Sequence, residues 1–147
     1  MAEAIFRQLA GEVSCPWTIG SAGTHATAGA PATPEAREVM LGLGLDIGGH
    51  RSRQLSADIL ADIDLVLTMT ENHKQMIQNE FPHLADKVFT VKEYGGQVEE
   101  LNISDPYGYG LETYRRVADE LQERLALVLG RLQLEACAEP VENGTGR

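Results

Sequence analysis

The sequence has 147 residues, two cysteines and a formal net charge of −10 at pH 7, and a chain of this length is most simply one domain. So large an excess of acid disfavours nucleic acid as a partner, because binding to a phosphate backbone depends on many Lys and Arg contacts. The cysteines lack C-x-x-C spacing and no apolar run of about 18 residues occurs, so we expect a cytoplasmic protein with no structural zinc site and no membrane span.

The first half of the sequence predicts two helices separated by a short strand and a segment of small residues. Residues 2–10 carry apolar side chains on one helical face. Residues 17–19 form a β-favouring run, and small residues fill 20–32. Thr33 is placed to cap a second helix, which has proline at its first position and is expected to stop near Gly44.

The second half of the sequence continues this alternation of strands and helices. Residues 56–60 predict a short capped helix, 64–69 a buried strand, 71–81 a helix and 88–91 another strand. The last helix, 111–132, has apolar side chains spaced by three and four over about six turns. Strands interleaved with helices predict an α/β fold with a doubly wound parallel sheet, a three-layer α/β/α arrangement.

The domain is expected to end at residue 133. From Leu134 onward Pro, Gly, Asn and Glu accumulate without periodicity, so residues 134–147 predict a disordered tail. Ligands in this fold class bind beyond the carboxyl ends of the strands, which directs attention to the loops that follow them.

The loop before the last helix holds the best candidate for chemistry. It contains Asp105 followed by Pro106, among glycines that would let the loop close over a substrate. A carboxylic acid placed beside a phosphate can give a proton to the leaving group when a phosphate ester or phosphoramidate is broken. From composition alone, however, Asp-Pro is more often an ordinary turn that leads into a helix.

Five blocks of sequence favour a catalytic role for Asp105 over an ordinary turn. In order along the chain, they are Met1–Phe6, Ser21–Thr24, His50–Leu55, Asp64–Met69 and Asp105–Gly108. Together they resemble the low-molecular-weight protein tyrosine phosphatase family, and the resemblance runs from Met1 to about Leu132. Within that family the chain is most similar to the bacterial protein-arginine phosphatase branch, because of His73–Gln75, Val88–Tyr94 and the glycine after Asp-Pro-Tyr.

The resemblance implies a two-step phosphoryl transfer that uses neither a metal nor a cofactor. A cysteine thiolate attacks phosphorus, and Asp105 matches the acid that protonates the leaving group and then, once ionised, activates water. His50 matches a histidine that supports the phosphate-binding loop. Tyr107, next to Pro106, matches an aromatic residue at the substrate entrance. The implied partner is a phosphorylated protein, and the implied assembly is a monomer or weak homo-oligomer.

The family's nucleophile loop, of the form C-x-G-N-x-C-R-S, does not occur in this sequence. Cys15 and Cys137 lie far from any glycine-rich helix start, so we expect both to be inert and no nucleophile to be present. In the family, that loop and the first, central strand of the sheet precede the segment that begins here at Met1. We therefore expect the domain, residues 1–133, to be incomplete at its N-terminus, and this chain to be unstable and inactive, with Met1 an internal methionine of a longer protein.

Two other functions stay open. A non-catalytic binding module would keep the phosphatase scaffold and bind without turnover. An arsenate reductase of the same fold would need further redox cysteines after the strand near Thr68, and the sequence has none there. The sequence does not decide between phosphotyrosine and phosphoarginine as the substrate.

Overall fold

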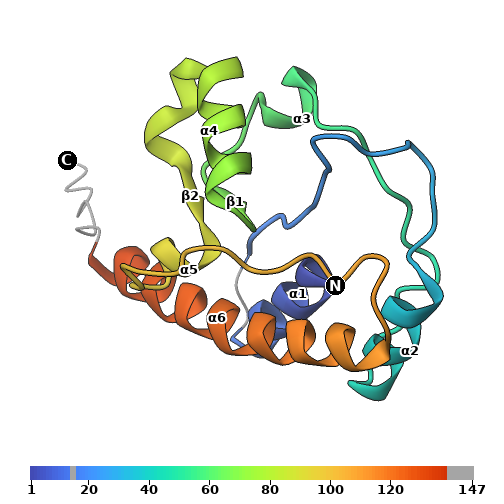
Figure 1. The fold of residues 1–147 in the computed structure, drawn as a ribbon. Coiled ribbons are helices and arrows are strands. Elements are labelled where there is room, and N and C mark those ends of the chain that lie inside the picture. The colour runs from blue at the N-terminus through green and yellow to red at the C-terminus, as the bar shows by residue number, and fades with distance from the viewer. Residues whose placement is uncertain (14–15, 139–147) are drawn as a thin grey trace, which may run out of the picture.

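Two parallel strands form the sheet in the computed structural model, which describes residues 1–13 and 16–138 (Figure 1). Strand β1 (Val66–Thr68) pairs with β2 (Val88–Thr90), with Val66 opposite Val88 and Leu67 opposite Phe89. The helices around them are α1 (Ala2–Glu12), α2 (Pro34–Gly42), α3 (Ala57–Leu60), α4 (Glu71–Glu80), the 3-10 helix η1 (Pro82–Lys87), α5 (Val91–Tyr94) and α6 (Leu111–Ala138). The α/β class with a parallel sheet is therefore confirmed.

Helices cover both faces of the sheet. Val66 and Val88 pack with Leu60, Ile77 and Leu84, beneath α4 and η1. Their neighbours Leu67 and Phe89 point the other way, because side chains alternate along a strand. This explains why both strand sequences are apolar on each side.

The larger of the two cores lies around α6. Figure 1 shows this long helix running beneath α1, with α2 packed at one end and α5 at the other. Its apolar stripe, predicted from the spacing of three and four, supplies much of this core. Its fully buried side chains include Ile5, Met40, Val91, Ile103 and Val128. The helix thus joins the first half of the chain to the sheet.

The predicted helix starts agree with the caps in the structure. The Thr33 hydroxyl accepts a hydrogen bond from the N–H of Ala36, Ser56 accepts one from Ile59, and Thr70 accepts one from His73. Thr90 does the same for Glu93, whose carboxylate accepts the Thr90 N–H in return. Because this reciprocal cap starts α5 at Val91, the second strand ends at Thr90 and not at Val91 as predicted.

The predicted strand at residues 17–19 is wrong, because this segment has no regular structure. It finds no strand partner among the described residues. Two side-chain contacts hold the segment in place. Arg7 Nε donates a hydrogen bond to the Ile19 carbonyl oxygen, 3.1 Å away. The Phe6 and Trp17 rings stack with their centroids 6.3 Å apart. A β-favouring run becomes a strand only when another strand satisfies its backbone.

The predicted start of a disordered tail at residue 134 is also wrong, since α6 continues to Ala138. Glu135 explains the extra turn. Its carboxylate accepts the Tyr94 hydroxyl over 2.5 Å and the Arg131 Nε over 2.7 Å. Arg131 also donates to the Tyr94 carbonyl over 3.2 Å, so the end of the helix is tied to α5. The rest of the predicted tail, residues 139–147, lies outside the described residues.

An ion pair between α4 and α5 is expected to make stability depend on pH. Burial raises the pKa of Glu93, but hydrogen bonds from Lys74 and from the Thr90 N–H outweigh this effect, and the pKa falls below its ordinary value of 4.5. Lys74 Nζ lies 2.8 Å from each carboxylate oxygen. A lowered pKa stabilises the folded state above the pKa of the unfolded chain, and this contribution is lost as pH falls through the folded value.

Lys74→Met should therefore lower the free energy of unfolding at pH 7 and have a smaller effect at pH 3. Urea unfolding followed by circular dichroism at both pH values measures the difference. Lys87→Met is the control, because Lys87 Nζ donates to the Ile63 carbonyl and has no carboxylate partner among the described residues. An equal cost of Lys74→Met at both pH values would show that the ion pair does not cause the pH dependence.

Candidate active site

The segment that carries Asp105 crosses the carboxyl end of β1. The N–H of buried Ile103 donates to the Met69 carbonyl, just past the strand, over 2.8 Å. One residue earlier, the Asn102 side chain accepts the N–H of Glu71 over 2.8 Å, at the first turn of α4. These two bonds fix the position of residues 102–103 at the edge of the sheet where this fold class binds ligands.

The loop after Ile103 presents Asp105 to solvent. Asp105 is exposed, and its Oδ1 accepts the N–H of Tyr107 over 3.0 Å. A turn follows, in which the Tyr109 N–H donates to the Pro106 carbonyl over 3.0 Å and Gly108 has φ of 82°. Glycine suits that left-handed conformation, which most residues avoid. The turn leaves Oδ2 of Asp105 free of hydrogen bonds to the described residues and open to a substrate.

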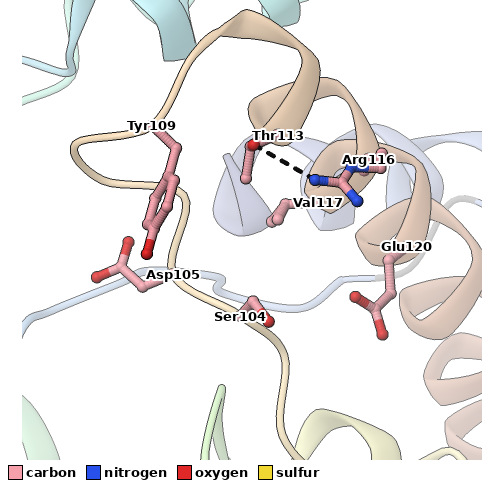
Figure 2. A pocket seen from close by; sticks show the side chains of 7 residues that line it. All are labelled: Ser104, Asp105, Tyr109, Thr113, Arg116, Val117 and Glu120. Atoms are coloured by element: carbon pink, nitrogen blue, oxygen red, sulfur yellow. Dashed lines mark hydrogen bonds between the residues drawn. The ribbon is translucent and has the colours of Figure 1, made fainter.

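A hollow of about 430 Å³ lies beside this carboxylate. Its walls are the loop on one side and the first turns of α6 on the other (Figure 2). The lining residues are Ser104, Asp105, Tyr109, Thr113, Arg116, Val117 and Glu120. In Figure 2 the side chains of Asp105 and Tyr109 face those of Arg116 and Glu120 across the hollow. A substrate side chain would therefore meet both charged and apolar groups here.

An ion pair closes the wall that α6 contributes. Lys92 Nζ lies 2.6 Å from Glu120 Oε1. The Lys92 side chain is 9% exposed and that of Glu120 is 31% exposed, so the ammonium is the more deeply buried partner. Lys92 is the second residue of α5, which directly follows β2. The pair thus links the carboxyl end of the second strand to the hollow beside Asp105.

The other predicted site residues lie outside the lining of this hollow. The Tyr107 side chain is 74% exposed. The backbone N–H of half-buried His50 donates to the Ile47 carbonyl over 3.1 Å, and its carbonyl accepts from Arg51 over 2.7 Å. Pro106 is half-buried, and its carbonyl closes the turn described above. Roles for Tyr107 and His50 remain predictions.

Sequence reasoning missed the walls of the hollow. The sequence-based predictions assign no role to Tyr109, Thr113, Arg116 or Glu120, and they include Lys92 only within the block Val88–Tyr94. One signal was present: Arg116 and Glu120 are four residues apart, on a helix face beside the apolar stripe. Nothing in the sequence indicates that Lys92 is the partner of Glu120.

Of the two cysteines, Cys137 alone lies within the described residues. Cys15 lies outside the described residues. Cys137 lies in the last turn of α6, and Thr113, which lines the hollow, lies in the first. At 1.5 Å per residue these two helix positions are about 36 Å apart. The position of residue 137 on α6 is therefore far from the hollow beside Asp105 of the same chain.

Within residues 1–13 and 16–138, no group of three or more His, Cys, Asp or Glu side chains is arranged to hold a metal ion. In the same part of the chain no helix combines the length and apolar character that crossing a membrane requires.

Comparison with known proteins identifies relatives along almost the whole chain. A family model described as low molecular weight phosphotyrosine protein phosphatase matches residues 1–138. The protein-arginine-phosphatase of Bacillus subtilis is 36% identical over 135 residues, which cover 90% of this chain and 87% of the relative. The probable low molecular weight protein-tyrosine-phosphatase EpsP of Ralstonia nicotianae is 37% identical over 122 residues, which cover 83% and 79%.

The fold is similar to solved structures of such enzymes. One is the arginine phosphatase YwlE, solved as a cysteine-to-serine mutant whose active-site serine is phosphorylated. It matches with a TM-score of 0.85 and 35% identity, over 90% of this chain and 86% of that one.

Proposed function

This chain belongs to the low molecular weight phosphotyrosine protein phosphatase family, and from that premise we propose that it acts on phosphotyrosine or phosphoarginine in proteins, with Asp105 as the general acid and base. The observation that supports this role is the position of the Asp105 carboxylate. It is exposed on a hollow beyond the carboxyl end of β1, on a loop fixed by the Ile103 bond to Met69.

The reaction has two steps, which together return the enzyme to its starting state. A cysteine thiolate attacks phosphorus, the bond from phosphorus to the leaving oxygen or nitrogen breaks, and Asp105 gives its proton to that atom. Water then attacks the phosphocysteine, Asp105 takes a proton from the water, and inorganic phosphate and the thiolate are released. The phosphorylated active-site serine in the YwlE mutant supports a covalent first step in that relative.

The nucleophile is the missing part of this scheme. The 147 residues contain no C-x-G-N-x-C-R-S segment, and Cys137 is too far along α6 to substitute for it. We propose that these residues by themselves do not turn over a phosphorylated substrate. The first step then needs a thiolate from a segment of that pattern, placed next to Asp105.

The test compares two proteins, the 147-residue chain and a chimera that adds the cysteine loop and preceding strand of the Bacillus subtilis relative at its amino end. Circular dichroism first establishes that each is folded. Phosphate release is then measured with phosphoarginine-containing protein and with a phosphotyrosine peptide. We expect release from the chimera alone, with a higher kcat/KM for phosphoarginine, since the sequence resembles that branch most.

Each other outcome has a definite meaning. Release by the 147-residue chain would overturn its proposed inactivity. A folded chimera that hydrolyses neither substrate would overturn the phosphatase proposal. Peptide binding by both proteins without hydrolysis by either would instead establish the non-catalytic binding module, and reduction of arsenate by the chimera would establish the reductase.

A further inference from the structure

Arg116 is an arginine without an ion-pair partner in the described part of the chain, and it faces the hollow beside Asp105. Its guanidinium is exposed and makes one long hydrogen bond, 3.4 Å from Nη2 to the Thr113 hydroxyl (Figure 2). That bond holds the group on the wall of the hollow and leaves its other N–H groups free.

Arg116 lacks a carboxylate partner because the neighbouring Glu120 already pairs with Lys92. Glu120, four residues further along α6, is at the spacing at which helical side chains pair. Its carboxylate is already bound by Lys92, 2.6 Å away, whose side chain is 9% exposed. If Glu120 moved to Arg116, a buried ammonium would lose its only carboxylate among the described residues, which is unfavourable. Lys92 therefore holds Glu120 and keeps Arg116 available.

We propose that Arg116 binds a carboxylate of the substrate protein, from an Asp or Glu close in sequence to the phosphorylated residue. The identity of the partner as a phosphoprotein rests on the proposed function. Because Asp105 and Arg116 line the same hollow, a peptide with its phosphorylated residue at Asp105 places a neighbouring side chain within reach of Arg116. The planar guanidinium suits a carboxylate, which it binds through two parallel hydrogen bonds.

The remaining walls fit the rest of such a side chain. Tyr109, 65% exposed, and Val117 offer apolar surface to its methylene groups. The acidic surface of the protein repels an acidic peptide at long range, but at physiological salt this repulsion decays over about 8 Å. Within the hollow, the free guanidinium decides the preference.

Binding of two phosphotyrosine peptides tests the proposal on the chimera in which the cysteine of the added loop is changed to serine, so that the phosphate-binding loop is present and turnover is blocked. The peptides are identical except for Glu or Gln next to the phosphotyrosine, and each carries a fluorescent label for anisotropy measurements at about 0.15 M salt. We expect the Glu peptide to bind at least fivefold more tightly. Arg116→Gln should abolish that preference. Arg115→Gln, which removes the same charge from an exposed neighbour outside the hollow, should keep it.

A second set of variants tests the part played by Lys92. In Lys92→Met the freed Glu120 should pair with Arg116 and remove the preference for the Glu peptide. In the double variant Lys92→Met with Glu120→Gln, Arg116 is free again and the preference should return. Circular dichroism verifies that each variant is folded, and the double variant shows that a loss in the single one is not caused by unfolding.

The outcomes separate this proposal from the phosphatase activity. Equal binding of the two peptides, or a preference that survives Arg116→Gln, would overturn the role of Arg116, whatever the chimera hydrolyses. A preference that depends on Arg116, together with no hydrolysis by the folded chimera, would overturn the phosphatase function and leave Arg116 as a binding residue for acidic peptides.

Discussion

Asp105→Asn is expected to lower kcat of the chimera by about 10²–10⁴-fold, the usual contribution of a positioned general acid or base. Asparagine has nearly the same shape as aspartate, and its side-chain oxygen can still accept the Tyr107 N–H that Asp105 Oδ1 accepts over 3.0 Å. The loop should therefore keep its conformation. The amide has no proton to give at the required acidity, so the leaving group departs as a strong base.

The dependence on the leaving group makes this test specific. Phenyl phosphate needs a proton on its leaving oxygen far more than p-nitrophenyl phosphate does. The variant should therefore lose more activity with phenyl phosphate than with p-nitrophenyl phosphate. Asp119→Asn is the matched control, because it removes the same charge from an exposed position on α6 outside the hollow. Unchanged hydrolysis of phenyl phosphate by the Asp105 variant would remove this residue from the mechanism.

The elements that the sequence predicted well are those specified by local contacts. Thr33 and Thr70 start α2 and α4 through bonds to residues three positions ahead, and such spacing is visible in a sequence. The apolar stripe of α6 is equally local. The strand predicted at residues 17–19 does not form, because a strand needs a partner from elsewhere in the chain. The last turn of α6 was missed because Glu135 finds its hydroxyl partner on Tyr94.

The residues of the candidate site likewise divide into those that the sequence predicts and those that only the packing of the helices brings together. Asp105 was predicted because Asp105–Gly108 is one of the five blocks that resemble the family, whereas Asp-Pro alone more often marks an ordinary turn. The opposite wall was not predicted, because Lys92 and Glu120 come from different elements and meet only after α5 has packed on α6. Arg116 lies four residues before Glu120 on α6, a spacing at which the two side chains could pair. Glu120 pairs instead with Lys92, because the buried ammonium needs a carboxylate more than the exposed guanidinium does. Arg116 is therefore free for a ligand.

Ile103→Ala should cost about 2–5 kcal/mol of unfolding free energy, the usual loss when a large buried aliphatic side chain is truncated. Ile103 is 2% exposed and belongs to the core that α6 shares with α1 and α2. Domains of this kind are stable by only about 5–15 kcal/mol in total. The variant is therefore expected to lose a large part of its stability, measured by urea unfolding at pH 7 with circular dichroism.

Val98→Ala provides the control, because Val98 is 87% exposed and its truncation should change stability by less than about 0.5 kcal/mol. Equal effects of the two substitutions would show that Ile103 does not anchor the segment. If Ile103 does anchor it, the loss should extend to function, since Ile103 lies two residues before Asp105 and its buried side chain supports the backbone bond from its N–H to the Met69 carbonyl at the end of β1. In the chimera, the variant should then lose kcat even under conditions in which it is fully folded, because the carboxylate of Asp105 is no longer held beside the phosphate.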